Sequence, residues 1–92
     1  MTMDRQPIVM YTTRFCPFCS RARQLLSYKS LDYEEIAVDF DAEKRSEMVE
    51  KSGRRTVPQI WIGVEHVGGC DELLSLERSG RLDALVMGAR DE

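Results

Sequence analysis

Two cysteines, Cys16 and Cys19, enclose Pro17-Phe18 at the point where a short apolar run gives way to a helical pattern. Pro17 suits the first position of a helix, where the missing N–H of proline is no loss. Cys16 would then lie at the helix N-terminus and Cys19 about one turn further along, so the two sulfurs would share a helix face. At this spacing the two thiols can form a disulfide.

The same placement predicts which cysteine reacts first. Unpaired N–H groups and the positive end of the helix dipole favour a thiolate at Cys16. The thiolate is the attacking species in disulfide exchange. Cys19, the more enclosed of the two, would attack the mixed disulfide that Cys16 forms. The motif therefore predicts a redox-active dithiol with Cys16 as nucleophile and Cys19 as resolving cysteine.

Hydrophobic periodicity predicts the order β-α-β-α-β-β-α, followed by a short C-terminal helix. The predicted strands span residues 8–12, 33–38, 59–62 and 65–67, and the predicted helices span residues 17–29, 42–52, 70–80 and 81–87. The first strand, helix and strand form a βαβ unit, so these two strands should be parallel. We predict an α/β protein with a mixed four-stranded sheet flanked by helices. A CxxC at the junction of the first strand and first helix is typical of a thioredoxin-like fold.

The whole-chain properties exclude several classes of protein. The 92 residues suffice for one domain, with residues 1–6 and 88–92 expected to fray. A net charge of −3 gives no reason to expect a nucleic acid partner. No apolar run approaches the ~20 residues that span a bilayer, and the first residues do not resemble a signal peptide. Three cysteines, two of them too close to staple a fold, suit a reducing compartment. We expect a cytoplasmic protein that acts as a monomer.

Four stretches of the sequence together resemble a dithiol glutaredoxin of the small bacterial type. They are Tyr11-Thr12, Cys16-Pro17-Phe18-Cys19, Thr56-Val57-Pro58-Gln59 and Gly68-Gly69-Cys70-Asp71. CxxC and Thr-Val-Pro are each weakly specific alone, but their order and spacing are specific, and the likeness covers roughly residues 8–85.

The resemblance implies a single glutaredoxin-like domain and a glutathione-dependent thiol–disulfide oxidoreductase. Glutathione would be the reducing co-substrate, with no tightly bound cofactor and no metal. The other partners would be disulfide-containing or glutathionylated proteins, with ribonucleotide reductase as an expectation at the level of the family.

The resemblance also implies where glutathione binds. Thr56, Val57 and Pro58 would line its groove, with Pro58 in the cis form facing the Cys16 sulfur. The backbone of Val57 would pair antiparallel with the cysteinyl unit of glutathione. The frequency of cis X–Pro bonds, about 5–6%, would by itself favour a trans bond here.

The Gly69-Cys70-Asp71 turn would hold the γ-glutamyl end of glutathione. The Asp71 carboxylate can meet the γ-glutamyl ammonium, and N–H groups at a helix N-terminus suit the carboxylate beside it. The Cys70 sulfur itself is more simply a buried inert thiol.

The sequence departs from the family pattern at two positions. Phe18 replaces the usual Tyr, which removes a hydroxyl but keeps an aromatic shield for the sulfur. Thr13 stands three residues before Cys16, where the family commonly carries a Lys that meets the glycine carboxylate of glutathione. Arg14 is the adjacent cation, and Arg45 occupies the position of a second carboxylate contact, so we expect Arg45 to matter more here.

Three alternatives remain at this point. Thr13 leaves open a thioredoxin-like redoxin that a flavoprotein reductase reduces in place of glutathione. A zinc module could use Cys16, Cys19, Cys70 and His66, although the second cysteine is followed by a helical pattern and lacks the tight turn of a zinc knuckle. An iron–sulfur cluster carrier is the third alternative. For His66 alone, a local hydrogen bond in the hairpin is the simpler interpretation.

Overall fold

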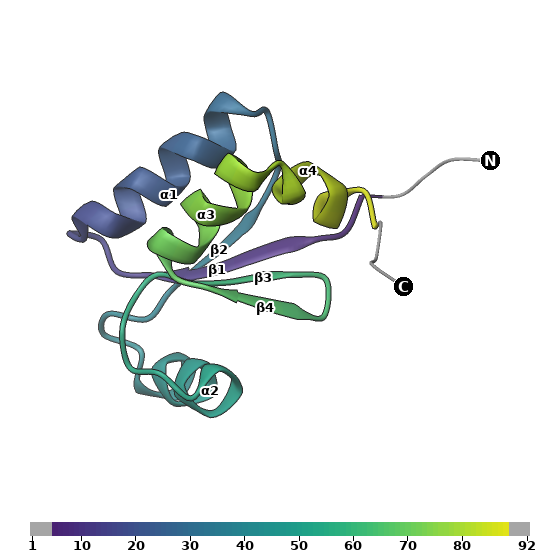
Figure 1. Cartoon of the computed structure of the whole chain (residues 1–92). Helices are drawn as coiled ribbons and strands as arrows, with labels where there is room; N and C mark the ends of the chain where they lie inside the picture. Colours follow the sequence, from purple (N-terminus) through teal and green to yellow (C-terminus); the bar gives the residue numbers. More distant parts are fainter. Residues whose placement is uncertain (1–4, 89–92) are drawn as a thin grey trace.

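The computed structural model describes residues 5–88, and its sheet has helices on both faces (Figure 1). The strands are β1 (Ile8–Thr12), β2 (Glu34–Ala37), β3 (Gln59–Ile62) and β4 (Glu65–Gly68), and the helices are α1 (Pro17–Tyr28), α2 (Ala42–Ser52), α3 (Cys70–Ser79) and α4 (Arg81–Val86). The strand order across the sheet is β2-β1-β3-β4. β1 is parallel to β2 and antiparallel to β3, and β3 is antiparallel to β4. The predicted mixed sheet and element order are confirmed.

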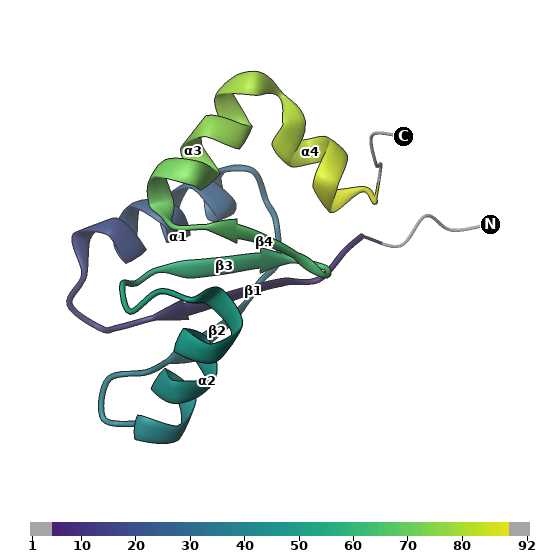
Figure 2. The same cartoon turned by 60° about the horizontal axis from the view of Figure 1, so that its bottom comes forward.

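Side chains that alternate along β1 divide the core into two clusters, one on each face of the sheet. Ile8 and Met10 belong to the larger cluster, together with Leu26 of α1 and Leu73 of α3. Tyr11 belongs to the smaller cluster, on the face that α2 covers. Figure 2 shows α2 alone on that face, with α1, α3 and α4 on the other.

The helix α2 packs on the sheet through both apolar and polar contacts. Met48 is fully buried, and the Tyr11 hydroxyl donates a hydrogen bond to Glu47. Burial and this bond to Glu47 raise the pKa of Tyr11 to about 12. The helix α2 has the predicted bounds and is capped at both ends: the Asp41 side chain accepts from the Lys44 N–H (3.1 Å), and Gly53 ends the helix in the left-handed conformation at φ 73°.

Some element boundaries differ by one residue from the predicted ones. β2 omits Tyr33, which packs against the larger core cluster. β4 extends one residue beyond the predicted strand, to Gly68. Gly68 pairs with Ile60 across an irregularity between Ile60 and Trp61, and a bulge of this kind lets a strand continue beyond its regular pairing.

The chain ends were expected to fray, and residues 1–4 and 89–92 lie outside the described residues. Gln6 and Gly88 were also expected to fray, but both are held by backbone hydrogen bonds. The Gln6 N–H donates to the Val86 carbonyl (2.7 Å), and the Gly88 N–H donates to the Leu85 carbonyl (3.0 Å). Within residues 5–88, none of the helices has the length and apolar character needed to cross a membrane.

Candidate active site

Cys16 is the N-cap of α1, and Pro17 occupies the start of the helix as predicted. Its sulfur accepts a hydrogen bond from the backbone N–H of Cys19, with an N···S distance of 3.4 Å. An N–H directed at the sulfur from the positive end of a helix favours negative charge there. The end of β1, the first turns of α1 and α3 and the start of β3 gather at this end of the sheet, on the left in Figure 1.

The two cysteines of the motif differ in exposure. All three cysteines of the chain are thiols in this structure; Cys16 is half-buried and Cys19 is 0% exposed. Burial is the main reason that the pKa of Cys19 is raised to about 12; the Thr13 backbone N–H and the charge of Arg23 act in the opposite direction. A substrate sulfur can therefore reach Cys16 but not Cys19, in keeping with their predicted roles.

The second side of the site is the segment before β3. The Val57–Pro58 peptide bond is cis, as the family resemblance implied. The Cys16 thiol lies 3.7 Å from the carbonyl oxygen of Val57 and donates to it. This contact places Val57, which is distant from Cys16 in the sequence, directly beside the nucleophilic sulfur.

Gln59 holds this segment in place, a role that the sequence interpretation missed. Its side chain is 0% exposed. Its Nε2 donates to the Thr56 carbonyl (3.0 Å) and hydroxyl (3.2 Å), and its Oε1 lies 2.8 Å from Nε2 of His66. A buried amide must satisfy its donors and acceptor, so one polar residue within the apolar β3 pattern was the available signal. The predicted local hydrogen bond of His66 is confirmed.

The third side is the start of α3. Gly69 is the N-cap, and its N–H donates to the Glu72 carboxylate (2.7 Å), which lowers the pKa of Glu72. A Cβ at Gly69 would lie 3.3 Å from the Pro58 carbonyl oxygen, so this turn lies close to the cis-proline. Cys70 is 4% exposed, and burial raises the pKa of its thiol, whereas Asp71 is exposed.

Metal-ligand side chains do not converge within the described residues. Across residues 5–88, no group of three or more His, Cys, Asp or Glu side chains is placed to hold a metal ion. His66 contacts Gln59, so the four-ligand zinc set considered from the sequence is not assembled.

Comparison with known proteins places this site in a family. A family model described as glutaredoxin matches residues 8–67. A glutaredoxin of Pseudomonas aeruginosa is 59% identical over 80 residues, which cover 87% of this chain and 95% of that protein. The chain belongs to the glutaredoxin family. It is a thiol–disulfide oxidoreductase of the glutaredoxin type.

Solved glutaredoxin structures have the same thioredoxin-like fold. The solution structure of glutaredoxin from Brucella melitensis superimposes with a TM-score of 0.82 at 45% identity, covering 96% of this chain and 97% of that one. A crystal structure of a buckwheat glutaredoxin–glutathione complex gives a TM-score of 0.81 at 30% identity, covering 94% of this chain and 83% of that one.

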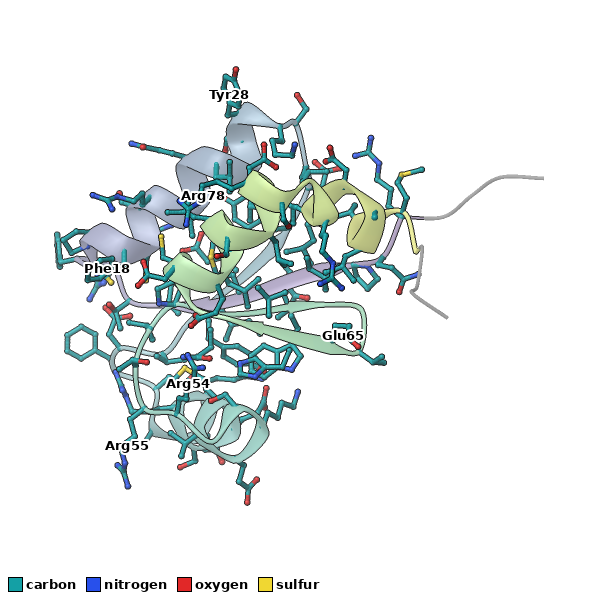
Figure 3. All side chains as sticks on the ribbon, viewed as in Figure 1. Phe18, Tyr28, Arg54, Arg55, Glu65 and Arg78 are labelled. Atoms are coloured by element: carbon teal, nitrogen blue, oxygen red, sulfur yellow. The ribbon has the colours of Figure 1, made fainter. Side chains whose placement is uncertain are left out.

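Two of the residues that the glutaredoxin resemblance implied, Arg14 and Arg45, lie on different segments, the β1–α1 loop and α2. Arg14 donates from its backbone N–H (3.3 Å) and Nε (3.2 Å) to Asp39. Arg45, on α2, donates from Nη1 to the Arg55 carbonyl (3.5 Å), and Figure 3 shows Arg55 projecting beside α2. Phe18 is 53% exposed and projects from the N-terminal end of α1 (Figure 3).

A polar cluster that the sequence interpretation missed supports the loop before Cys16. Arg23 of α1 donates from Nη2 to the Thr13 carbonyl (3.3 Å) and from Nε to the Glu35 carboxylate (2.7 Å). The Thr12 hydroxyl also donates to Glu35 (2.7 Å). Glu35 on β2 thus ties the helix that carries the cysteines to the strand that precedes them.

Replacing Glu35 should therefore weaken the fold most clearly above acidic pH. Hydrogen bonds from Arg23, and also from Thr12, hold the pKa of Glu35 below its ordinary value of 4.5. A carboxyl with a depressed folded-state pKa contributes stability above its unfolded pKa, and this contribution is lost as the pH falls through the folded pKa. We expect Glu35→Gln to lower the free energy of unfolding at pH 7 by about 1 kcal/mol. Between about pH 5 and pH 3, the stability of this variant should fall less with decreasing pH than that of the wild type.

Urea denaturation of the wild type and the Glu35→Gln variant across this pH range measures both effects. Glu34→Gln, at an exposed position in the same strand, is the matched control. Equal stabilities of wild type and Glu35→Gln at pH 7 would show that the cluster contributes nothing to folding.

Proposed function

We propose that this glutaredoxin uses glutathione to reduce protein disulfides and protein–glutathione mixed disulfides. The observation that carries the proposal is the position of Cys16, an accessible N-cap thiol directed at the carbonyl of Val57. The similarity to a glutaredoxin solved in complex with glutathione supports the choice of co-substrate.

The proposed reaction on mixed disulfides uses Cys16 alone. The Cys16 thiolate attacks the glutathionyl sulfur, the S–S bond to the substrate protein breaks, and the protein thiolate leaves and takes up a proton. A second glutathione thiolate then attacks the glutathionyl sulfur on Cys16. This releases glutathione disulfide and regenerates the thiolate, so that two glutathione sulfurs supply the two electrons.

The proposed reaction on protein disulfides uses both cysteines. Cys16 attacks one sulfur of the substrate disulfide and releases the other as a thiolate. Cys19 then attacks the Cys16 sulfur, which releases the second substrate thiol and leaves a Cys16–Cys19 disulfide. Two glutathiones reduce that disulfide and leave as glutathione disulfide.

The proposed glutathione groove lies between the segment before β3 and the start of α3. Backbone groups of Val57 would pair with the cysteinyl unit, and Asp71 with the N-terminal turn of α3 would bind the γ-glutamyl end. The full proposed binding set is Arg14, Phe18, Arg45, Thr56, Val57, Pro58, Gly69, Cys70 and Asp71. Because Arg45 occupies the position of the second carboxylate contact in the family pattern, we assign the main contact with the glycine carboxylate to Arg45.

The test is a comparison of two reducing systems on one small substrate, the mixed disulfide of cysteine and glutathione. Glutathione with glutathione reductase should support turnover, and thioredoxin reductase without glutathione should not. Turnover only with thioredoxin reductase would reject glutathione dependence. That result would favour the redoxin alternative that Thr13 raised.

The role of Asp71 gives a second, quantitative prediction. Asp71→Ala removes the exposed carboxylate proposed to bind the γ-glutamyl ammonium, so we expect KM for the glutathione mixed disulfide to rise about tenfold. Asp32→Ala, at an exposed position between α1 and β2, is the matched control and should leave KM unchanged. Steady-state kinetics measure both, and an unchanged KM for Asp71→Ala would remove Asp71 from the groove.

A further inference from the structure

Three exposed phenylalanines lie at the active-site end of the sheet, two on loops and one in the first turn of α1. Phe15 is 93% exposed, Phe18 is 53% exposed and Phe40 is 90% exposed. Phe15 immediately precedes Cys16 in the β1–α1 loop, and Phe18 lies in the first turn of α1. Phe40 lies in the loop between β2 and α2. These are half of the six large apolar side chains that are exposed among the described residues.

The two loops are joined to each other. The Val38 N–H donates to the Thr12 carbonyl (2.8 Å), so the loops begin from paired positions of β2 and β1. Beyond that point, Arg14 donates to Asp39, and its guanidinium lies 5.0 Å from the centre of the Phe40 ring. Phe40 is therefore fixed beside the segment that carries Phe15 and Cys16.

Phe40 is presented outward in an unusual backbone conformation. Its φ is +67°, in the left-handed region that bulky residues seldom adopt. Such conformations are concentrated at functional sites, where the surrounding structure enforces them. Here the ion pair and the cation–π contact of Arg14 hold a ring that reaches solvent and packs on no core cluster of the described chain.

The chemistry of this surface indicates a polypeptide partner. Exposed aromatic rings with a neighbouring arginine are typical of protein interaction sites. The Arg14 side chain remains 62% exposed although it is paired with Asp39, so the surface offers positive charge beside the rings. Complementary groups are aromatic or aliphatic side chains together with a carboxylate.

We propose that Phe15 and Phe40, here called the aromatic rim, bind the polypeptide segment that carries the substrate sulfur and favour an apolar and an acidic residue next to its cysteine. The inference rests on the proposed function, since it takes the Cys16 sulfur as the group that attacks the substrate disulfide. The rim adjoins Cys16, whereas the proposed glutathione groove is formed by Val57 and the start of α3. A small disulfide therefore has no need of the rim.

The experiment compares three glutathione mixed disulfides in single turnovers with the pre-reduced protein. One is a peptide with Phe and Glu beside its cysteine, one is the same peptide with Gly and Gln there, and one is free cysteine. The wild type should react about tenfold faster with the Phe/Glu peptide than with the Gly/Gln peptide. The double variant Phe15→Ala, Phe40→Asn should lose this preference and keep the rate on the cysteine substrate. Asn tolerates positive φ, so the change at residue 40 removes the ring and not the loop conformation.

Tyr28→Ala is the matched control, since Tyr28 is 87% exposed at the opposite end of α1 (Figure 3). This variant should retain the peptide preference. The proposed role of the aromatic rim would be overturned if the double variant kept the preference for the Phe/Glu peptide. It would also be overturned if the wild type showed no such preference. An equal loss on all three substrates would also overturn it, because it would indicate damage to Cys16 itself. Single turnovers do not require a glutathione cycle, so failure of the rim and failure of glutathione-dependent turnover are separate results.

Discussion

Cys16→Ser is expected to lower turnover of both mixed disulfides and protein disulfides by about 10³-fold or more. Cys16 is the accessible thiol of the motif, and the N-cap geometry favours charge on its sulfur. A serine hydroxyl is not ionised near neutral pH and cannot form a disulfide. Because Cys19 is 0% exposed, it cannot take over the first attack.

Cys19→Ser should separate the two reactions. The proposed reaction on mixed disulfides needs Cys16 alone, so this variant should reduce the cysteine–glutathione mixed disulfide within a few-fold of the wild type. Reduction of a protein disulfide should stop at a mixed disulfide on Cys16, which mass spectrometry can detect. Activity retained by Cys16→Ser, or loss of both reactions in Cys19→Ser, would contradict these roles; circular dichroism checks that each variant is folded.

Local sequence signals were sufficient for most of the fold. Pro17 at the start of α1, Asp41 at the cap of α2 and Gly80 after α3 mark ends that depend on a few neighbouring residues. Short continuous apolar runs placed β1 and β3 correctly, because a strand with core on both faces needs apolar residues at successive positions. Boundaries moved by a residue where tertiary pairing decided them, as at Gly68.

Contacts between distant segments could not be predicted in the same way. The bonds from Arg23 to Glu35 and from Gln59 to His66 depend on how helix and strands are brought together, which no local pattern specifies. The position of Phe40 over Arg14 is a further example. The cis bond at Pro58 came from the family resemblance alone, since the low frequency of cis X–Pro bonds by itself favours trans.

The resolving step should depend steeply on pH, because Cys19 is protonated at neutral pH. Burial, the largest cause, and the neighbouring Cys16 together raise its pKa to about 12, although Arg23 acts to lower it. When Cys16 is in a mixed disulfide its charge is absent, but the burial remains. The thiolate fraction of Cys19 then rises about tenfold with each pH unit, so we expect the resolving rate to rise about 100-fold between pH 6 and pH 8.

Rapid-quench trapping of the mixed disulfide on Cys16 measures this rate directly. The Cys19→Ser variant supplies the baseline, since its mixed disulfide can decay only by attack of an external thiol. Arg23→Gln should slow the step at every pH without changing its slope, because it removes a charge that favours the Cys19 thiolate. A resolving rate that stays constant from pH 6 to pH 8 would contradict a mechanism in which the Cys19 thiol ionises before it attacks. It would mean that the departing substrate thiolate, the base generated closest to the pair, takes the proton from Cys19 as the disulfide is resolved.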